Sequence, residues 1–266
     1  MKPRISGFTF YDGPSMLDGA PIVAVLTGLK KASNNSKTGG ALYQTWILRR
    51  DVNPIAATHS GDDASICGGG DDGCRHRGII IMVRKSKKYP QGRKNVKRSC
   101  YVRLDTAPLN VWRSFHRGIY PHLPLNAARE FMAHAVRGGS YGDPAAVPIH
   151  VWEALLHDTP SGTAYTHQWR RFPELAAFAM ASCDSEQERV EAKLLGFRTF
   201  RVRKPDEPIF AREVACPASK EMQHKTTCDL CKACGGQRAK AKADIVIMAH
   251  GPQFKVNAFL QQGVME

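Results

Sequence analysis

The chain has 266 residues, and 42% of them are hydrophobic, which is enough for one large α/β domain or two smaller ones. Its 38 Lys and Arg against 24 Asp and Glu give a net charge of +14. Such an excess favours a polyanionic partner, and we expect a nucleic acid, because basic surfaces displace the counterions of phosphate chains. With no secretory signal pattern and no apolar run of membrane-span length, we expect a cytoplasmic protein without membrane contact.

The first part of the chain, residues 1–60, predicts β structure. Residues 22–27 and 41–49 are rich in strand-forming side chains, and a Ser-, Asn- and Gly-rich loop at 32–40 separates them. The second part, residues 61–104, contains most of a polar loop at 58–78 with Cys67 and Cys74, then a short apolar strand at 79–83. The third part, residues 105–266, is expected to form a β/α domain.

Residues 84–103 form a strongly basic segment, with nine Lys or Arg and no acid. Tyr89, Pro90 and Gly92 within it favour a loop over a helix, and a strand is expected to resume at residues 99–102. The segment predicts contact with a phosphate backbone; the alternative is a solvated insertion. The candidate nucleic-acid residues are Arg84, Lys85, Lys87, Lys88, Arg93, Lys94, Lys97 and Arg98.

From residue 125 the pattern becomes an alternation of strands and helices. We expect helices at residues 125–136, after Pro148, at 172–178 and at 185–195, the last beginning at a Ser-x-x-Glu capping box. Strands are expected to end near residues 143 and 169, and to occupy residues 180–182, 199–203, 213–216 and 245–249. This alternation predicts a parallel sheet, open or curled into a barrel, with function at the carboxyl ends of its strands.

Polar residues and cysteines gather at those strand ends, so we expect a pocket there. Each has a plainer interpretation: Asp184 and Ser185 can cap a helix, and Tyr165 and Trp169 can belong to the core. Cys183 is a nucleophile only with a base such as His167, and a buried free cysteine is the commoner case. The strand-end segments are 140–143, 165–169, 182–185, Arg203, Cys216 and 250–251.

Seven of the eight cysteines fall into two clusters that predict metal binding. Cys228, Cys231 and Cys234 form two overlapping C-x2-C steps, and Cys216, followed by proline, can supply a fourth ligand. Thiolates this close repel one another, so a zinc ion or an iron–sulfur cluster is the simplest way to hold them together. The second cluster comprises Cys67, Cys74 and Cys100, and His76 could complete a Cys3His zinc site with it.

Three motifs in the chain resemble a known family. Tyr-Gly-Asp-Pro at 141–144, Tyr-Thr-His-Gln-Trp at 165–169 and Ser-Cys-Asp-Ser-Glu-Gln-Glu at 182–188 resemble the strand-end succession of phage-encoded, three-cysteine radical-SAM-like proteins. Cys100-Tyr101 is similar to the cysteine–aromatic ending of radical-SAM cluster loops, and the C-terminal cysteines are similar to an auxiliary cluster or zinc site. The resemblance spans residues 67–251 and lies in the order and character of the motifs.

The resemblance implies a partial (β/α) barrel of radical-SAM type with a β-rich N-terminal part and cysteine-rich metal loops. It implies a 4Fe–4S cluster on Cys67, Cys74 and Cys100, with one iron open to S-adenosylmethionine. The spacings C-x6-C and C-x25-C differ from the usual C-x3-C-x2-C, so the basic segment must be an excursion that lets the ligands converge. The candidate site residues are Asp143, His167 and Asp184 for catalysis and Ser140, Tyr165, Ser182 and Arg203 for cofactor binding.

Three functions are compatible with these observations. The first is a radical-SAM-type, iron–sulfur enzyme acting on a nucleic acid or nucleotide, in the cytoplasm of the host if the protein is phage-encoded. The second is a nucleic-acid-binding protein with two structural zinc sites and no catalysis. The third is a small-molecule transferase or hydrolase with a zinc-stabilised tail, in which Asp143, His167 and Asp184 transfer protons.

Overall fold

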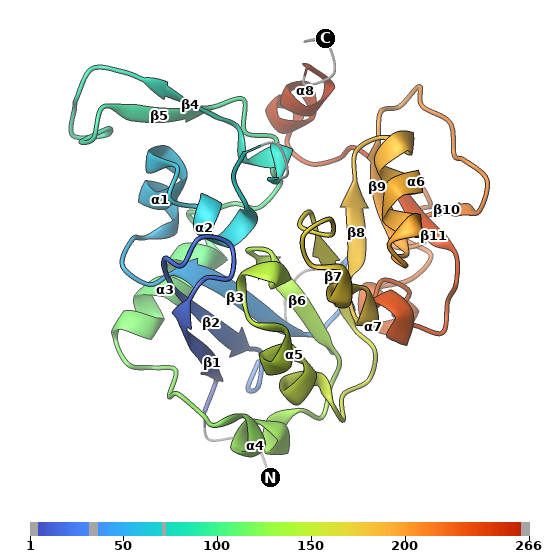
Figure 1. Ribbon diagram of the computed structural model, residues 1–266, viewed down its shortest axis with the longest axis horizontal. Helices are drawn as coiled ribbons and strands as arrows, with labels where there is room; N and C mark the ends of the chain where they lie inside the picture. Colours follow the sequence, from blue (N-terminus) through green and yellow to red (C-terminus); the bar gives the residue numbers. More distant parts are fainter. Residues whose placement is uncertain (1–4, 32–36, 71–72, 262–266) are drawn as a thin grey trace.

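The computed structural model describes residues 5–31, 37–70 and 73–261, and its centre is a nine-stranded sheet (Figure 1). The sheet begins with the antiparallel strands β1 (Gly7–Pro14), β2 (Pro21–Thr27) and β3 (Tyr43–Arg49). The other pairings are parallel and continue the order with β6 (Val136–Tyr141), β7 (Thr163–Thr166), β8 (Met180–Cys183), β9 (Thr199–Arg203), β11 (Asp244–Met248) and β10 (Glu213–Ala215).

This topology confirms the predicted mixed α/β class with a mostly parallel sheet. β3 pairs directly with β6, so the N-terminal strands and the strands of the third part belong to one sheet. The parallel strands have their carboxyl ends at a common edge, which is where the sequence analysis places the polar side chains. Within the described residues, no helix combines the length and the apolar character that a membrane span requires.

The helices between the parallel strands are short. From residue 125 to β9 they are α4 (Leu125–Ala128), α5 (Ile149–Leu156) and α6 (Glu186–Leu194), with 3-10 turns at Arg129–Phe131, Pro144–Ala146 and Pro173–Ala177. Ser185 caps α6 as predicted, because its hydroxyl accepts a hydrogen bond from the Glu188 backbone N–H. The Glu188 carboxylate accepts from the backbone N–H of Asp184 rather than from that of Ser185.

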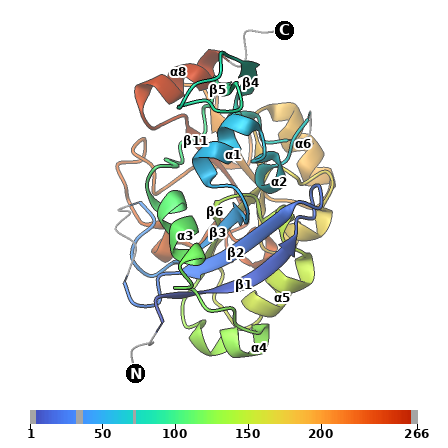
Figure 2. The same cartoon turned by 90° about the vertical axis from the view of Figure 1, so that its left-hand side faces the viewer.

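A long insertion connects β3 to β6 and carries the first cysteine cluster. It contains α1 (Pro54–Ser60), α2 (Ala64–Cys67), a 3-10 turn at Arg75–Arg77, the antiparallel hairpin β4 (Ile79–Met82) and β5 (Arg93–Val96), and α3 (Ala107–His116). At the other end of the chain lie α7 (Cys228–Cys231), a 3-10 turn at Gly236–Arg238 and α8 (Gln253–Gln261). Both views place α8 at the same end of the molecule as the hairpin (Figures 1 and 2).

Several local predictions were wrong, mostly where tertiary packing outweighs local propensity. Residues 58–78 were expected to be a loop but contain α2 and the end of α1, and β5 forms inside the basic segment 84–103. No strand forms at 99–102, and the helix expected at 125–136 ends after one α turn and a 3-10 turn because Val136 opens β6. The helix expected at 172–178 is a 3-10 turn, and β1, α3 and α8 were not predicted. Part of the loop at 32–40 lies outside the described residues.

Aromatic packing joins the helices to the sheet. Trp152 on α5 is fully buried, and its ring lies 5.4 Å from that of Phe10 on β1 and 5.5 Å from that of Phe178. The Trp152 indole N–H donates to the carbonyl oxygen of Pro144, so the polar edge of this large side chain is also satisfied. These contacts hold α5 against the N-terminal strands.

A buried ion pair connects β9 to β10 across β11. The Arg201 guanidinium donates two hydrogen bonds of 2.8 Å to the Glu213 carboxylate, and these side chains are 1% and 0% exposed. Removing one partner of such a pair leaves an uncompensated charge in the interior. The pair therefore makes the C-terminal end of the sheet sensitive to single substitutions.

We predict that Arg201→Ala lowers the free energy of unfolding by about 3–5 kcal/mol, because Glu213 would stay buried without its cation. Arg103→Ala is the matched control, since Arg103 pairs with Asp105 and both side chains are more than half exposed. The control should cost less than about 1 kcal/mol. Urea unfolding of the two variants measures both values, and equal losses would contradict the assignment.

Candidate metal centre and cavity

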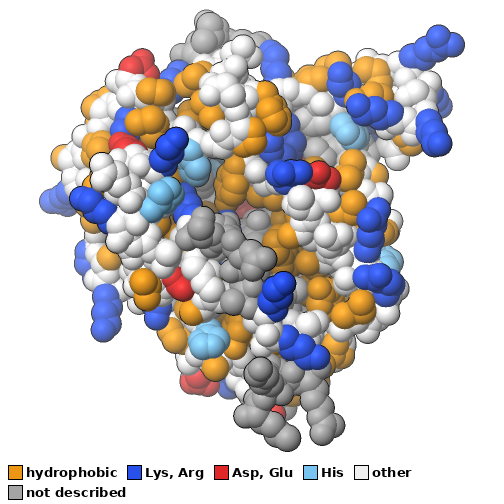
Figure 3. Space-filling view, turned by 180° about the vertical axis from the view of Figure 1, so that it is seen from behind, with side chains coloured by type: hydrophobic (Ala, Val, Ile, Leu, Met, Phe, Trp, Pro, Cys, Tyr) orange, Lys and Arg blue, Asp and Glu red, His pale blue; other side chains and the backbone are white. Residues whose placement is uncertain are grey.

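One cavity is lined by the whole of the first cysteine cluster and by one member of the second. We call Cys67, Cys74 and Cys100 the N-terminal cysteine group, and Cys216, Cys228, Cys231 and Cys234 the C-terminal cysteine group. A cavity of about 370 Å³, here named the central cavity, is lined by all three members of the first group and by Cys228 of the second. Its walls come from β6, β7, β8, β9, β11, the β3–β6 insertion, the 37–38 segment, α7 and α8. Figure 3 shows a hollowed face with apolar side chains inside and Lys, Arg and His side chains around it.

Backbone hydrogen bonds bring the N-terminal cysteine group together. The N–H of Cys74 donates to the carbonyl oxygen of Cys67 at 3.1 Å, and the N–H of Cys100 donates to that of His76 at 3.0 Å. Between Cys74 and Cys100 the chain leaves as β4 and returns as β5, with Ile79 paired to Val96. The irregular C-x25-C spacing is thus the length of a hairpin excursion, as the sequence analysis required.

The thiols of Cys67 and Cys74 are buried away from solvent. Burial raises the pKa of the Cys67 and Cys74 thiols well above the ordinary value, and neighbouring thiols add to the effect. The positive charge of Arg77 partly opposes the shift at Cys67. Without a metal these thiols are neutral at pH 7, and a metal ion or cluster would replace their protons.

The C-terminal cysteine group is fixed by contacts with three separate segments. The N–H of Cys216 donates to the carbonyl oxygen of Val246 on β11, and the N–H of Ala164 on β7 donates to that of Cys234. The N–H of Cys228 donates to the carbonyl oxygen of Lys37, which draws α7 against the 37–41 segment. These bonds, together with a small buried apolar cluster that includes Cys216, Ala233 and Cys234, give the loop a defined position.

The sulfur positions do not suit a single metal ion. All eight cysteines are free and described, and no three of their sulfur atoms lie within 4.8 Å of one another in the described structure. Tetrahedral zinc, with Zn–S bonds of about 2.3 Å, would place its sulfur ligands about 3.8 Å apart. A single zinc ion at either group would therefore require the cysteine side chains to rotate toward one another.

The three predicted catalytic residues lie close together but have different roles in the structure. The Asp143 carboxylate accepts hydrogen bonds from the backbone N–H groups of Ala145 and His167, at 3.0 and 2.8 Å, and burial raises its pKa. Asp143 therefore positions the loop that carries His167. The Asp184 carboxylate is instead within hydrogen-bond distance of His76, with 3.2 Å between its Oδ1 and Nε2 of the imidazole.

Asp184 is a buried but ionised carboxylate. Burial alone would raise its pKa, but His76, His167 and Arg75 outweigh that effect and lower the pKa to about 2. The other ring nitrogen of His76, Nδ1, lies 2.8 Å from the Ser99 hydroxyl. A Cys3His zinc site would require one ring nitrogen of His76 to face the thiols. The two ring nitrogens face Ser99 and Asp184 instead, so the structure does not support that site.

The predicted cofactor-binding residues divide into two sets. Ser140, Tyr165 and Ser182 line the central cavity. Arg203 is buried and takes no part in the lining, because its guanidinium pairs with Glu221 and donates to backbone carbonyl oxygens of the 204–207 segment. Arg203 therefore stabilises the fold through an ion pair and is not placed to bind a cofactor in the cavity.

The central cavity is rich in cations, and most of them were not predicted as site residues. Arg98 is a predicted nucleic-acid residue that turns inward, where it donates to the carbonyl oxygens of Cys100 and Val102. Burial lowers the pKa of Lys37 and of Lys255, and the thiols near each lysine oppose the shift. Arg137 lies on β6 and also lines the cavity. The alternation of side chains along that strand is the one sequence signal from which its position could have been predicted. The cationic lining is Lys37, Arg77, Arg98, Arg137 and Lys255, against the acids Asp63 and Asp143.

A second cavity, also of about 370 Å³, lies between α1, the β4–β5 hairpin and α3; we call it the hairpin groove. It combines cations with aromatic rings. The Tyr89 ring lies edge-on to His59 at 5.2 Å, and Trp112 on α3 donates its indole N–H to the carbonyl oxygen of Arg49. Sequence analysis missed the contribution of α3. The relevant lining residues are His59, Lys88, Tyr89, Arg93, Trp112 and Arg113.

Comparison with protein-family models, with curated proteins and with solved structures finds no match to this chain. The central cavity and the hairpin groove are therefore the features of the molecule that bear on its function.

We predict that Cys231→Ser loses bound metal and lowers the thermal unfolding midpoint, because one ligand of the C-terminal cysteine group is removed. Cys183→Ala is the matched control, since Cys183 is fully buried and belongs to neither group. The control should keep the metal content of the wild type. Metal analysis and thermal unfolding measure both effects, and full metal content in Cys231→Ser would remove Cys231 from the ligand set.

Proposed function

We propose that this chain is an iron–sulfur protein of radical-SAM-like type that acts on a nucleic acid or nucleotide. The observation that carries the proposal is that one cavity is lined by all three cysteines of the N-terminal group and by Cys228 of the C-terminal group, which is distant in sequence. The N-terminal cysteine group would hold a 4Fe–4S cluster with one iron open to S-adenosylmethionine. The parallel strands from β3 to β10 would then form the partial barrel that the family resemblance implies.

The chain's own residues would protect and position the bound groups. When bound, a 4Fe–4S cluster supplies the electron that cleaves S-adenosylmethionine. The position of the thiols inside the cavity excludes bulk water from the ligands, and Arg77 and Arg98 lie close enough to offset negative charge on them. α8 covers part of the same cavity with Lys255, Val256 and Phe259. The site can thereby confine a reactive species away from solvent.

The lining of the central cavity favours an anionic substrate that carries a ring. Five Lys or Arg side chains face two acids in the lining, which suits a phosphate or carboxylate group. Tyr165 and Phe200 lie with ring centroids 4.5 Å apart on the wall, and their rings provide a surface against which a base can pack. A nucleotide turned out of a strand would satisfy both features.

The hairpin groove supplies the second part of the proposal. Lys88, Arg93 and Arg113 line it together with Tyr89 and Trp112, so cations and aromatic rings occur together in one hollow. That combination is typical of single-stranded nucleic-acid sites, where bases stack on rings and phosphates pair with cations. Arg84, Lys85 and Lys87 extend the basic surface along the exposed hairpin.

We predict that protein purified without oxygen is brown and contains iron and acid-labile sulfide. The grouping of the cysteines supports this outcome, because cysteine thiolates are the ligands that hold iron–sulfur clusters. Iron, sulfide and zinc analysis with a visible spectrum before and after dithionite provides the measurement. A colourless protein with about two zinc ions per chain would instead support the non-catalytic, zinc-braced alternative.

If the spectrum shows a cluster, S-adenosylmethionine cleavage to 5′-deoxyadenosine under dithionite is the next measurement. Cys100→Ser should abolish cleavage, while Cys183→Ala should retain it. An intact cluster that never cleaves S-adenosylmethionine would contradict the radical-SAM-like part of the proposal and leave the iron–sulfur part standing.

We predict that Tyr89→Ala weakens binding of a single-stranded oligonucleotide by about 1–3 kcal/mol, through loss of one stacking surface. In the double variant Lys88→Glu with Arg113→Glu, log affinity should fall less steeply with log salt. The slope should become less negative by about 1.4, because two phosphate contacts are lost. Lys242→Glu, an exposed lysine outside the groove, is the control for charge reversal. Titrations at several salt concentrations test both, and a slope unchanged in the double variant would exclude the hairpin groove.

A further inference from the structure

We propose that His76, His167 and Asp184 form a binding site for one divalent transition-metal ion, separate from the two cysteine groups. One ligand atom from each residue lies within 4.8 Å of the others. In the described part of the chain this is the only set of three His, Cys, Asp or Glu residues that meets that distance. The proposal does not depend on what the cysteines bind.

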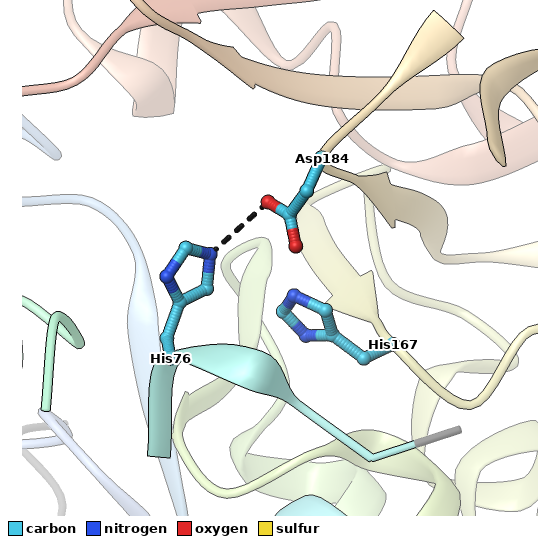
Figure 4. A group of neighbouring side chains, drawn as sticks. All are labelled: His76, His167 and Asp184. Atoms are coloured by element: carbon cyan, nitrogen blue, oxygen red, sulfur yellow. Dashed lines mark hydrogen bonds and ion pairs between the residues drawn. The ribbon is translucent and has the colours of Figure 1, made fainter. Parts of the chain in front are cut away.

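The fold brings the three residues together from separate elements. His167 follows β7 and Asp184 follows β8, and these neighbouring strands are parallel, so both side chains lie at the carboxyl edge of the sheet. His76 enters from the β3–β6 insertion, on the 3-10 turn that follows Cys74. Figure 4 shows the two imidazole rings turned toward the Asp184 carboxylate from different sides.

The strongest indication of a missing ligand is at His167. Its Nε2 atom is buried and has no hydrogen-bond partner in the described structure. A buried nitrogen left in this state is costly, so such atoms require an explanation. A hydrogen-bonded His76–Asp184 pair would account for those two residues alone, whereas a metal ion would also satisfy Nε2 of His167.

The ligands are held in place by a second set of contacts. The Nδ1 atom of His76 lies 2.8 Å from the Ser99 hydroxyl, which leaves Nε2 as the atom that faces Asp184. The backbone N–H of His167 donates to Asp143, and that of Asp184 donates to Glu188. Contacts of this kind orient metal ligands and are a regular part of metal sites.

The donor set determines which ions fit. Two imidazole nitrogens and one carboxylate oxygen suit Zn²⁺, Fe²⁺, Co²⁺ or Mn²⁺ and leave coordination positions open. His76 and His167 both line the central cavity, so the open positions would face a bound substrate. There the ion would act as a Lewis acid on a phosphate oxygen or on a bound water.

Mn²⁺ is the appropriate probe, because it prefers nitrogen and oxygen ligands and competes poorly for thiolates. We expect the full chain, purified without oxygen and with its cysteine-bound metal in place, to bind one Mn²⁺, measured by loss of the free Mn²⁺ electron paramagnetic resonance signal. His167→Gln and Asp184→Asn should each weaken binding by more than about 100-fold, since they remove a ligand. His59→Gln, a histidine of the hairpin groove, should bind Mn²⁺ as the wild type does.

Two results would overturn the site: no Mn²⁺ uptake by the wild type at millimolar concentration, or equal uptake by the wild type and both ligand variants. Thermal unfolding and the metal content of the cysteine groups establish that each variant is folded. Ser99→Ala is the second test if a ligand variant fails to fold, and it should weaken Mn²⁺ binding by about 10–100-fold. Unchanged binding in Ser99→Ala would then count against the site. Iron and sulfide analysis is independent of these results, so the site and the proposed iron–sulfur function can fail separately.

Discussion

The parallel pairing of β3 with β6 is the constraint on which the rest of the structure depends. Two parallel neighbours require a crossover, and here the crossover is a long insertion that leaves the sheet at the carboxyl end of β3. That exit places the N-terminal cysteine group, the β4–β5 hairpin and His76 above the same edge at which β7 and β8 end. The central cavity, the hairpin groove and the His–Asp cluster all follow from this connection.

Burial of charge shapes both ends of the sheet, with opposite consequences. In the C-terminal strands Arg201 and Glu213 neutralise each other with full hydrogen bonding, so their burial contributes only to structure. In the central cavity cations face thiols, and His167 retains an unpaired nitrogen. An interior that leaves this nitrogen unpaired is suited to a ligand, since a bound metal ion would complete the interaction that the chain leaves open.

The strand-end residues show which site residues can be predicted from local sequence patterns and which cannot. Asp143, His167 and Asp184 were identified because they follow strands, and parallel topology does place their loops together. Arg203 satisfies the same pattern but is committed to Glu221, a partner that no local pattern identifies. His76, Lys37 and Lys255 come from the insertion, a loop and the last helix, and only long-range contacts bring them to the cavity.

The sequence by itself determined the α/β class, most strands of the parallel sheet, the capped start of α6 and the two cysteine clusters. These follow from short-range periodicity, capping chemistry and residue spacing, which are properties of neighbouring residues. The tertiary structure alone decided that Cys228 lines the same cavity as the N-terminal cysteine group, that the basic segment joins a hairpin and that His76 pairs with Asp184 across 108 positions. Such contacts depend on strand order and crossover path, which are set by the packing of the whole chain.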